Sequence, residues 1–408
     1  MKPSMIAPIL ALALLTVPAK ADVIMDWNAK ADAIGIEKQL VNSANARGQA
    51  MIHVAMFEAV NAIDRRYTPY KLNLTADHGT SREAAAVSAA HDVLVALYPD
   101  QKADLDSTLA TSLSAIADGE AKSKGIELGK KAAAEIIALR ANDGSNTPES
   151  YRPQTSPGAY VPTTVPAEST AARITPWVMK AASQFRPTPP PALTSEVWTR
   201  DLNEIREFGA LNSSKRSAEQ TTIGRFWFFT GPRTFNGIVR QVATAKKMDL
   251  VDCARLYALT AMAASDAFIA VFEGKYAYNL WRPITAIRNA DQTSNPATPR
   301  EASWVPLGTT PMHPEYPCAH CIVASAVSNV LQIVVGNEVG EITLTSPTAP
   351  GVTRKWTRLQ DYSDEVSNAR VYAGFHYRFS TEAAKDMGKK IAELAVSTQL
   401  LGNVAAAK

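Results

Sequence analysis

Five residues in the last third of the sequence carry the side chains that an oxyanion pocket requires. They lie in three short segments, and they are Lys275, Arg282, His320, Arg370 and His376. Arginine can bind two oxygens at once through its planar guanidinium, and lysine supplies a compact charge. Histidine can move a proton near neutral pH. If the chain brings these side chains together, they would bind a phosphate-like anion and act on it.

The first segment places two cations close to two helical turns apart. Lys275 and Arg282 are separated by seven residues, which predicts that both lie on one side of a helix that Pro283 ends or kinks. Their separation along the axis, about 10 Å, suits two long side chains that converge on one ion. Taken alone, the pair fits a solvated basic helix face better.

The second segment precedes an apolar run, 321–335, and is expected to begin a helix. Cys318 would lie near the N-cap, Ala319 would offer its backbone N–H, and His320 would act as an acid or base. The plainer alternative is a capping turn beside a core histidine. In the third segment Gly374 separates Arg370 from His376 and permits a helix break that would let the two side chains meet.

The order of these motifs resembles one known superfamily. Lys-x6-Arg-Pro, Pro-(Ser/Cys)-(Gly/Ala)-His and Arg-x5-His are similar to the vanadium-dependent haloperoxidases and type-2 phosphatidic acid phosphatases, above all to the secreted haloperoxidase-like branch. Segments outside the pocket resemble that branch too, so the likeness covers most of the chain; they are Asp26-Trp27-Asn28, 57–64 and 183–187.

The resemblance implies an all-α helical bundle of the haloperoxidase/acid phosphatase type and a role for each matched residue. The implied oxyanion ligands are Lys275, Arg282, Cys318, Ala319 and Arg370. His376 would bond to the vanadium of vanadate, or attack phosphorus, and His320 would be the general acid or base. Lys275 would also be catalytic, because it would polarise bound peroxide. The implied cofactor is vanadate, and phosphate would fit the same site.

Cys318 and Ala319 depart from the family's usual Ser and Gly. Alanine keeps the N–H, but a thiol near a helix N-terminus among cations should become a thiolate. A thiolate would repel the anion and be oxidised by peroxide, so we expect Cys318→Ser to raise peroxidase activity. Cys318 and Cys321 also form a Cys-x-x-Cys, for which redox and metal-binding roles are weaker alternatives. The odd, low cysteine count argues against a disulfide-stapled fold, and the sequence leaves open whether Cys253, Cys318 or Cys321 form a disulfide.

These observations favour a vanadate-dependent haloperoxidase-like enzyme that uses peroxide to oxidise a halide or an organic substrate. The alternative is a secreted acid phosphatase that acts on phosphate monoesters through a phosphohistidine. A third reading is an oxyanion-binding protein whose turnover the Ser-to-Cys change has weakened. His313 and Phe272 are candidates to line the pocket mouth, although His313 fits a surface position equally well.

Composition narrows the class of protein. The 408 residues are 46% hydrophobic and 20% charged, as in globular proteins, and the net charge of +3 excludes broad attraction to nucleic acid. Residues 1–21 have the basic start, apolar run and small-x-small site of a cleaved signal peptide, which predicts a secreted or periplasmic protein. We expect no membrane span in the mature chain, because the apolar run at 321–335 is short and contains polar residues.

The helical pattern divides the chain into regions that position the site. Residues 22–150 form a predicted N-terminal helical scaffold, and residues 194–408 a predicted C-terminal helical region that binds the oxyanion and carries catalysis. The only strand-like patch is 341–345. Residues 151–193 contain nine prolines that exclude a helix or central strand. We interpret this segment as an ordered loop over the site mouth, with a disordered linker as the alternative. Helices are expected at 50–63, 82–97, 104–117, 122–141, 195–208, 218–227, 235–247 and 251–272.

Overall fold

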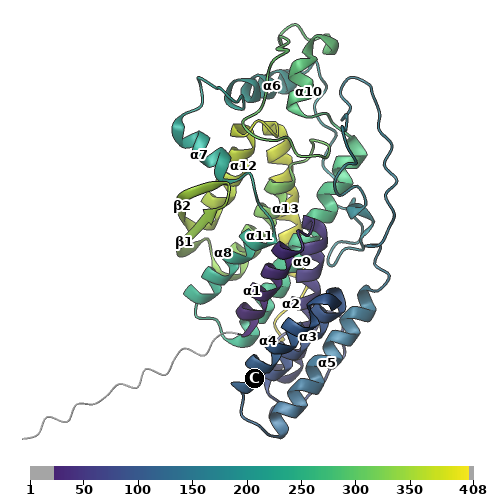
Figure 1. The fold of residues 1–408 in the computed structure, drawn as a ribbon, viewed down its shortest axis with the longest axis vertical. Helices are drawn as coiled ribbons and strands as arrows, with labels where there is room; N and C mark the ends of the chain where they lie inside the picture. Colours follow the sequence, from purple (N-terminus) through teal and green to yellow (C-terminus); the bar gives the residue numbers. More distant parts are fainter. Residues whose placement is uncertain (1–22, 404–408) are drawn as a thin grey trace, which may run out of the picture.

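Helix α9 (Leu250–Tyr278) runs through the centre of the molecule (Figure 1). Asp249 caps its start by accepting a hydrogen bond from the Asp252 N–H, and Asn279 ends it in the left-handed conformation. Small residues such as Ala254, Ala258 and Ala261 are buried along it, which allows neighbouring helices to approach closely. Among residues 23–403, which a computed structural model describes, α9 is the helix long and apolar enough to cross a membrane, but most of its residues are buried by the surrounding helices. The predicted signal peptide at 1–21 lies outside the described residues.

The N-terminal helices form one end of an elongated molecule (Figure 1). Helix α2 packs against both α9 and α3, and α3 packs against α5. This group therefore supports α9 mainly through α2. Its helices are α1 (Val23–Glu37), α2 (Asn42–Asp64), α3 (Arg82–Leu97), α4 (Lys102–Ser114) and α5 (Glu120–Arg140).

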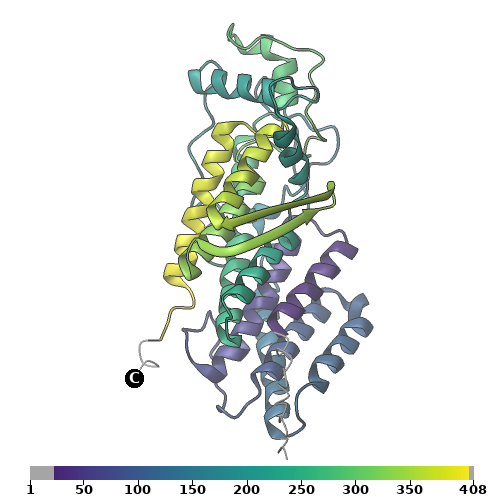
Figure 2. The same ribbon diagram turned by 90° about the vertical axis from the view of Figure 1, so that its left-hand side faces the viewer.

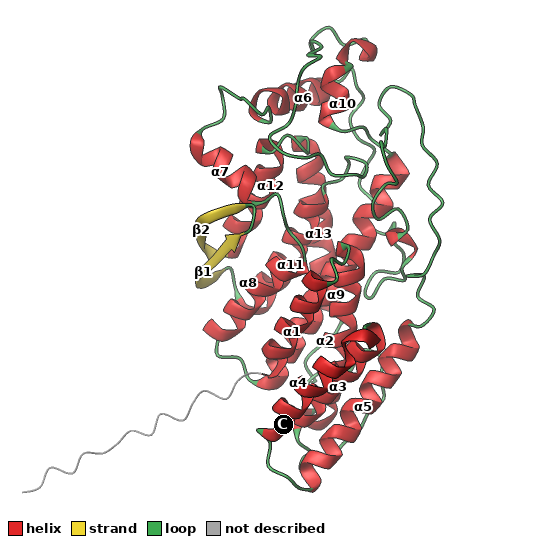
Figure 3. Ribbon diagram, viewed as in Figure 1, coloured by secondary structure: helices red, strands yellow, loops and turns green. Residues whose placement is uncertain are grey.

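The C-terminal helices surround the other half of α9 (Figure 3). Helix α11 packs on α9, α13 and α12, so the three predicted site segments start or end on elements that touch one another. The helices are α6 (Glu196–Phe208), α7 (Ala218–Phe226), α8 (Pro232–Ala245), α10 (Pro283–Arg288), α11 (Ala319–Val335), α12 (Leu359–Tyr372) and α13 (Arg378–Thr398).

One antiparallel hairpin interrupts the helical fold. Strands β1 (Glu338–Ser346) and β2 (Ala349–Arg358) pair with each other and pack against α7, α8 and α12 (Figure 2). The prediction of a mostly helical fold is confirmed, and the strand-like patch at 341–345 lies within β1. The prediction did not include β2, α1, α10, α12 or α13.

The proline-rich segment lies against α9 as an ordered loop. The buried carboxylate of Asp266 accepts backbone N–H groups of Trp177, Val178 and Met179 at 2.7, 2.8 and 2.8 Å. Further along, the Tyr276 hydroxyl donates to the carbonyl of Ala167. These contacts explain how a segment with almost no regular structure is held in place beside the site.

Candidate active site

Lys275 lies on the last turn of α9 and is fully buried. Its Nζ donates to the carbonyl oxygens of Pro314 (3.0 Å) and Glu315 (2.8 Å), in the segment that precedes α11. Burial holds the pKa of Lys275 well below its ordinary value, and the nearby Arg282 lowers it further. An ammonium has three N–H donors, so one remains for a ligand after these two bonds.

The spacing predicted that Arg282 lies on the same helix as Lys275, but this prediction is wrong. Helix α9 ends at Tyr278, and Arg282 lies beyond its end. Asn279 turns the chain at a φ of 49°, and Arg282 becomes the N-cap of α10. Its guanidinium donates to the carbonyls of His313 (2.7 Å) and Phe375 (3.0 Å) and contacts the rings of His313 (2.9 Å) and His376 (3.3 Å). The expected convergence with Lys275 is therefore achieved by a bend in the backbone and not by one helix face.

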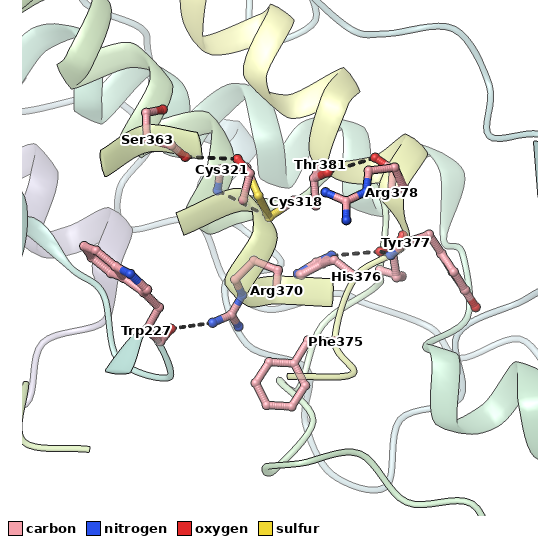
Figure 4. The surroundings of a disulfide bond; sticks show 12 residues. Trp227, Cys318, Cys321, Ser363, Arg370, Phe375, His376, Tyr377, Arg378 and Thr381 are labelled. Atoms are coloured by element: carbon pink, nitrogen blue, oxygen red, sulfur yellow. Dashed lines mark hydrogen bonds and ion pairs between the residues drawn. A yellow bond between two sulfur atoms is a disulfide. The ribbon is translucent and has the colours of Figure 1, made fainter. Parts of the chain in front are cut away.

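Gly374 provides the predicted break between Arg370 and His376. Helix α12 ends at Tyr372, and Gly374 has a φ of 79°, where a Cβ would lie 2.6 Å from the Gly209 carbonyl oxygen. Both side chains are buried as a result of this turn. Figure 4 shows them among the surroundings of the disulfide at the start of α11.

His376 is oriented by a buried carboxylate. Its Nδ1 lies 2.8 Å from Oε1 of Glu315, which also accepts the Tyr377 N–H at 3.0 Å. A carboxylate only accepts hydrogen bonds, so the proton of the neutral ring is assigned to Nδ1. The Arg282 guanidinium faces the other nitrogen, Nε2, which assigns the same tautomer. Nε2 therefore keeps a lone pair that could bond to a metal or attack phosphorus.

Burial raises the pKa of Glu315 to about 7, against the opposing effect of Lys275 and Arg282. The pKa of His376 is held well below its ordinary range by burial and then by Arg282. The ring is consequently neutral at physiological pH, as a ligand or nucleophile must be.

The guanidinium of Arg370 retains N–H donors for a ligand. Its NH1 group donates to the Trp227 carbonyl at 2.5 Å, and its guanidinium carbon lies 4.8 Å from the centre of the Phe375 ring. Nε and NH2 are buried and have no hydrogen-bond partner within residues 23–403. Burial, followed by the charge of Arg282, lowers its pKa to about 9. Buried guanidinium N–H groups normally have partners, so these two indicate the position of an anionic ligand.

The start of α11 faces this group. Cys318 is the N-cap, as predicted, and the N–H groups of Ala319 and His320 have no carbonyl partner within the helix. His320 forms a hydrogen bond with the backbone of Phe228, whereas its Nε2 is buried without a partner in the described part of the chain. Burial, and then Arg370, lowers the pKa of His320. A bound anion beside it would favour the protonated ring.

Cys318 and Cys321 form a disulfide across the first turn of α11, with Cα atoms 5.4 Å apart (Figure 4). The prediction of a thiolate at Cys318 is therefore wrong, because a sulfur in a disulfide does not titrate. It also has no proton to donate, so the side chain of Cys318 cannot contribute the hydrogen bond expected of an oxyanion ligand. It instead accepts the Cys321 N–H at 3.3 Å and caps the helix. Cys253 is buried and is not part of the disulfide.

A cavity of about 350 Å³ reaches the start of α11, and His313, Ala319 and His320 are part of its wall. Five phenylalanines also line it, so we call it the phenylalanine cavity; they are Phe228, Phe229, Phe235, Phe268 and Phe272. The expectation that His313 and Phe272 line the pocket mouth is confirmed, and their rings meet edge to face at 5.3 Å. Ala167 and Glu168 of the proline-rich loop complete the wall, as expected for a loop at the site mouth.

The charges of the buried group fit vanadate or phosphate. Lys275, Arg282 and Arg370 bring three basic side chains, whereas the carboxylate of Glu315 contacts the group through His376. Uncompensated buried charge is unfavourable, and a tetrahedral oxyanion would relieve it. Lys275, Arg370 and the helix N-terminus retain donors for its oxygens, and His376 Nε2 supplies a lone pair.

Comparisons with known proteins agree with this geometry. A sequence profile of the VCPO second helical-bundle domain matches residues 255–401, which contain all five candidate side chains. Over 242 residues the chain is 28% identical to vanadium chloroperoxidase of Curvularia inaequalis, an alignment that covers 44% of this chain and 39% of that protein. The chain is therefore similar to vanadium haloperoxidases in both sequence and fold.

Solved structures of vanadium haloperoxidases share the fold over most of the chain. The structure described as the first bacterial vanadium-dependent iodoperoxidase is 26% identical, with a TM-score of 0.79, and the match covers 94% of this chain and 96% of that one. A holo-type bacterial vanadium-dependent chloroperoxidase shares the fold at 18% identity and a TM-score of 0.70, covering 87% and 92%. The chain spans less than half the length of the Curvularia enzyme.

The structure thus brings together Lys275, Arg282, His320, Arg370 and His376, as the haloperoxidase-like motifs predicted. Sequence reasoning missed Glu315, which fixes the His376 tautomer, and the carbonyl of Trp227, which holds Arg370. Glu315 had one available signal: it is an acidic residue two positions ahead of the Pro317-Cys318-Ala319-His320 motif.

Proposed function

We propose that this protein is a vanadate-dependent haloperoxidase that uses peroxide to oxidise a halide. In the net reaction a halide and a proton react with hydrogen peroxide to give hypohalous acid and water. The observation that carries the proposal is the group of three buried cations with unpaired Arg370 donors beside the Nε2 lone pair of His376. The sequence relationship to vanadium chloroperoxidase and the fold of an iodoperoxidase support it.

Each residue has a defined task in this proposal. Lys275, Arg282 and Arg370 would hold the oxygens of vanadate, with the N–H groups at the start of α11, and His376 Nε2 would be its ligand to the metal. Vanadate would supply Lewis acidity at this place. The remaining N–H of Lys275 would orient peroxide, and His320 would accept and return a proton through Nε2.

The test combines metal binding with turnover. Purified protein is incubated with vanadate, its vanadium content is measured, and oxidation of iodide, bromide and chloride by peroxide is followed. Arg370→Ala should lose vanadate and activity, and Arg370→Lys, which keeps the buried charge, should be intermediate. Arg300→Ala is the control, because the Arg300 side chain is 53% exposed and contacts Asp291 and the backbone carbonyl of Arg288, neither of which belongs to the site. Stoichiometric vanadium without oxidation of any halide would overturn the proposal.

The Glu315–His376 pair favours phosphoester hydrolysis as a second candidate function. His376 Nε2 would attack phosphorus as the ester P–O bond breaks, His320 would protonate the leaving oxygen, and water would then cleave the P–N bond. Release of phosphate from a monoester, without peroxide and with inhibition by vanadate, identifies this activity.

We also propose that the protein is exported to an oxidising compartment. The leader-like residues 1–21 and the Cys318–Cys321 disulfide support this, since disulfides persist mainly outside the cytosol. Cell fractionation with N-terminal sequencing of the mature protein tests it, and recovery of the intact N-terminus from the cytosol would refute it.

A further inference from the structure

A second cavity lies between helix α8 and strand β1 (Figure 1). Its volume is about 330 Å³, within the range of sites for small organic molecules. None of the five candidate active-site residues lines it, and it shares only Phe229 with the phenylalanine cavity. Its wall contains Arg233 and Arg240, so we call it the arginine cavity.

The spacing of three residues on α8 shapes the arginine cavity. Arg233, Gly237 and Arg240 are four and three positions apart, so they lie on one face of the helix with the glycine between the two arginines. A Cβ at Gly237 would make only ordinary contacts, with Leu344 Cδ2 at 3.7 Å and Arg240 NH2 at 3.9 Å. The glycine therefore leaves open space in the wall that a larger side chain could fill.

The arginine cavity has more positive than negative charge. The NH1 group of Arg240 donates to Asp32 at 2.7 Å, and the same carboxylate also accepts a hydrogen bond from Asn236 at 2.8 Å. Arg233 forms no ion pair within residues 23–403, and its guanidinium carbon lies 5.7 Å from the centre of the Phe229 ring. Two guanidinium groups therefore share one carboxylate, and an anion in the cavity would balance the second positive charge.

The remaining walls are polar and held in place. Thr234, Thr343 and Thr345 contribute to them, and each carries a hydroxyl group. The side chain of Gln241 fixes β1 to α8, because its amide donates to the Thr343 carbonyl at 2.9 Å and accepts the Thr343 N–H at 2.8 Å. The cavity is therefore formed before a ligand arrives, and its hydroxyl groups suit a ligand that carries hydroxyl groups too.

We propose that the arginine cavity binds a small hydroxylated carboxylate. A guanidinium can bind both oxygens of a carboxylate at once, and that of Arg233 is available to do so. A single halide or inorganic oxyanion would leave most of the volume empty, which favours an organic anion with a polar body. The cavity borders the oxyanion group at Trp227, whose carbonyl holds Arg370, but it contains none of the side chains assigned to vanadate. The inference is therefore independent of the proposed haloperoxidase function.

The experiment measures binding by calorimetry, on the full protein without vanadate, peroxide or halide. The probe is gluconate, a hydroxylated carboxylate, with glucose as its neutral counterpart and sulfate as an inorganic anion. Arg233→Ala removes the guanidinium that lacks an ion pair, and Gly237→Leu fills the space between the two arginines. Arg225→Ala is the matched control, because Arg225 is an exposed arginine of α7 that does not line the cavity.

We expect saturable binding of gluconate and not of glucose or sulfate. Arg233→Ala should weaken it about tenfold or more, because hydrogen bonds to a charged group are lost. Gly237→Leu should abolish binding in a folded protein, since leucine favours a helix more than glycine does, and circular dichroism checks the fold. Arg225→Ala should bind as the wild type does. Absence of saturable gluconate binding, equal affinity for glucose or sulfate, or equal gluconate affinity in all four proteins would overturn the inference.

Discussion

The Cys318–Cys321 disulfide removes a hydrogen-bond donor from the edge of the oxyanion site, and restoring that donor should strengthen vanadate binding. The double variant C318S/C321A places a hydroxyl at the N-cap of α11 and removes the partner sulfur. A hydrogen bond to a charged group contributes about 1.5–3 kcal/mol, which corresponds to about a 10- to 150-fold lower Kd for vanadate.

The matched control is C318A/C321A, which loses the same disulfide and gains no donor. Both variants lose the cross-link of a short loop, which should lower the free energy of unfolding by about 2 kcal/mol. The serine variant should recover about 1 kcal/mol of the lost free energy of unfolding, because serine is a better N-cap than alanine. Its hydroxyl oxygen can accept the backbone N–H of residue 321, as the sulfur of Cys318 does in the wild type.

Vanadate affinity is measured by calorimetry at fixed pH, and stability by urea unfolding followed by circular dichroism. We expect the order of vanadate affinity to be C318S/C321A above wild type, with C318A/C321A close to wild type. Equal affinity in the two double variants would show that residue 318 does not face the anion, and the argument for its role would then be refuted.

Three further predictions concern other parts of the structure. Glu315→Ala removes the hydrogen bond that orients the ring of His376, so vanadate affinity should fall about 10- to 100-fold. Glu315→Gln keeps an acceptor and should lose less affinity. Equal losses in the two variants would show that Glu315 does not control the tautomer of His376. Cys321→Ala leaves a lone thiol at Cys318, so incubation with peroxide should inactivate this variant but not the wild type. Equal residual iodide oxidation in the two proteins would contradict this prediction. The pKa of His91 is raised by its hydrogen bonds to two aspartates, Asp92 first. Its stabilising effect should therefore be complete below about pH 6.5 and be lost as pH rises through the higher folded-state pKa. His91→Gln should consequently lower Tm more at acidic than at alkaline pH, and a pH-independent difference would exclude this linkage.

The elements that were predicted well carry local signals at both ends. Helix α3 was predicted with the bounds that the structure shows, since Ser81 is an N-cap and Pro99 stops the run. The helix start at Cys318 and the break at Gly374 were likewise readable, because each depends on a residue type with a specific backbone preference.

The misses have equally local causes. Asn279 ends α9 in the left-handed conformation, but an asparagine in a helical pattern does not by itself predict a stop, so Lys275 and Arg282 were placed on one helix. Strand β2 begins with Ala-Pro-Gly, and five of its ten residues are polar, which leaves little alternation to detect. The disulfide pairing was undetermined because three cysteines allow three pairs, and Glu315 has no periodic signature.

The disulfide also explains how a cysteine occupies a position beside the oxyanion group. A free thiol there would lie near Arg370 and the N-terminus of α11, conditions that favour the thiolate and its oxidation by peroxide. Pairing Cys318 with Cys321 removes the thiolate, and with it both the repulsion of the anion and the target of peroxide. The consequence is the loss of one hydrogen-bond donor, while the remaining donors of Lys275 and Arg370 and the helix N-terminus are retained. The substitution is therefore compatible with peroxide chemistry only as a disulfide, which links the proposed activity of this site to export into an oxidising compartment.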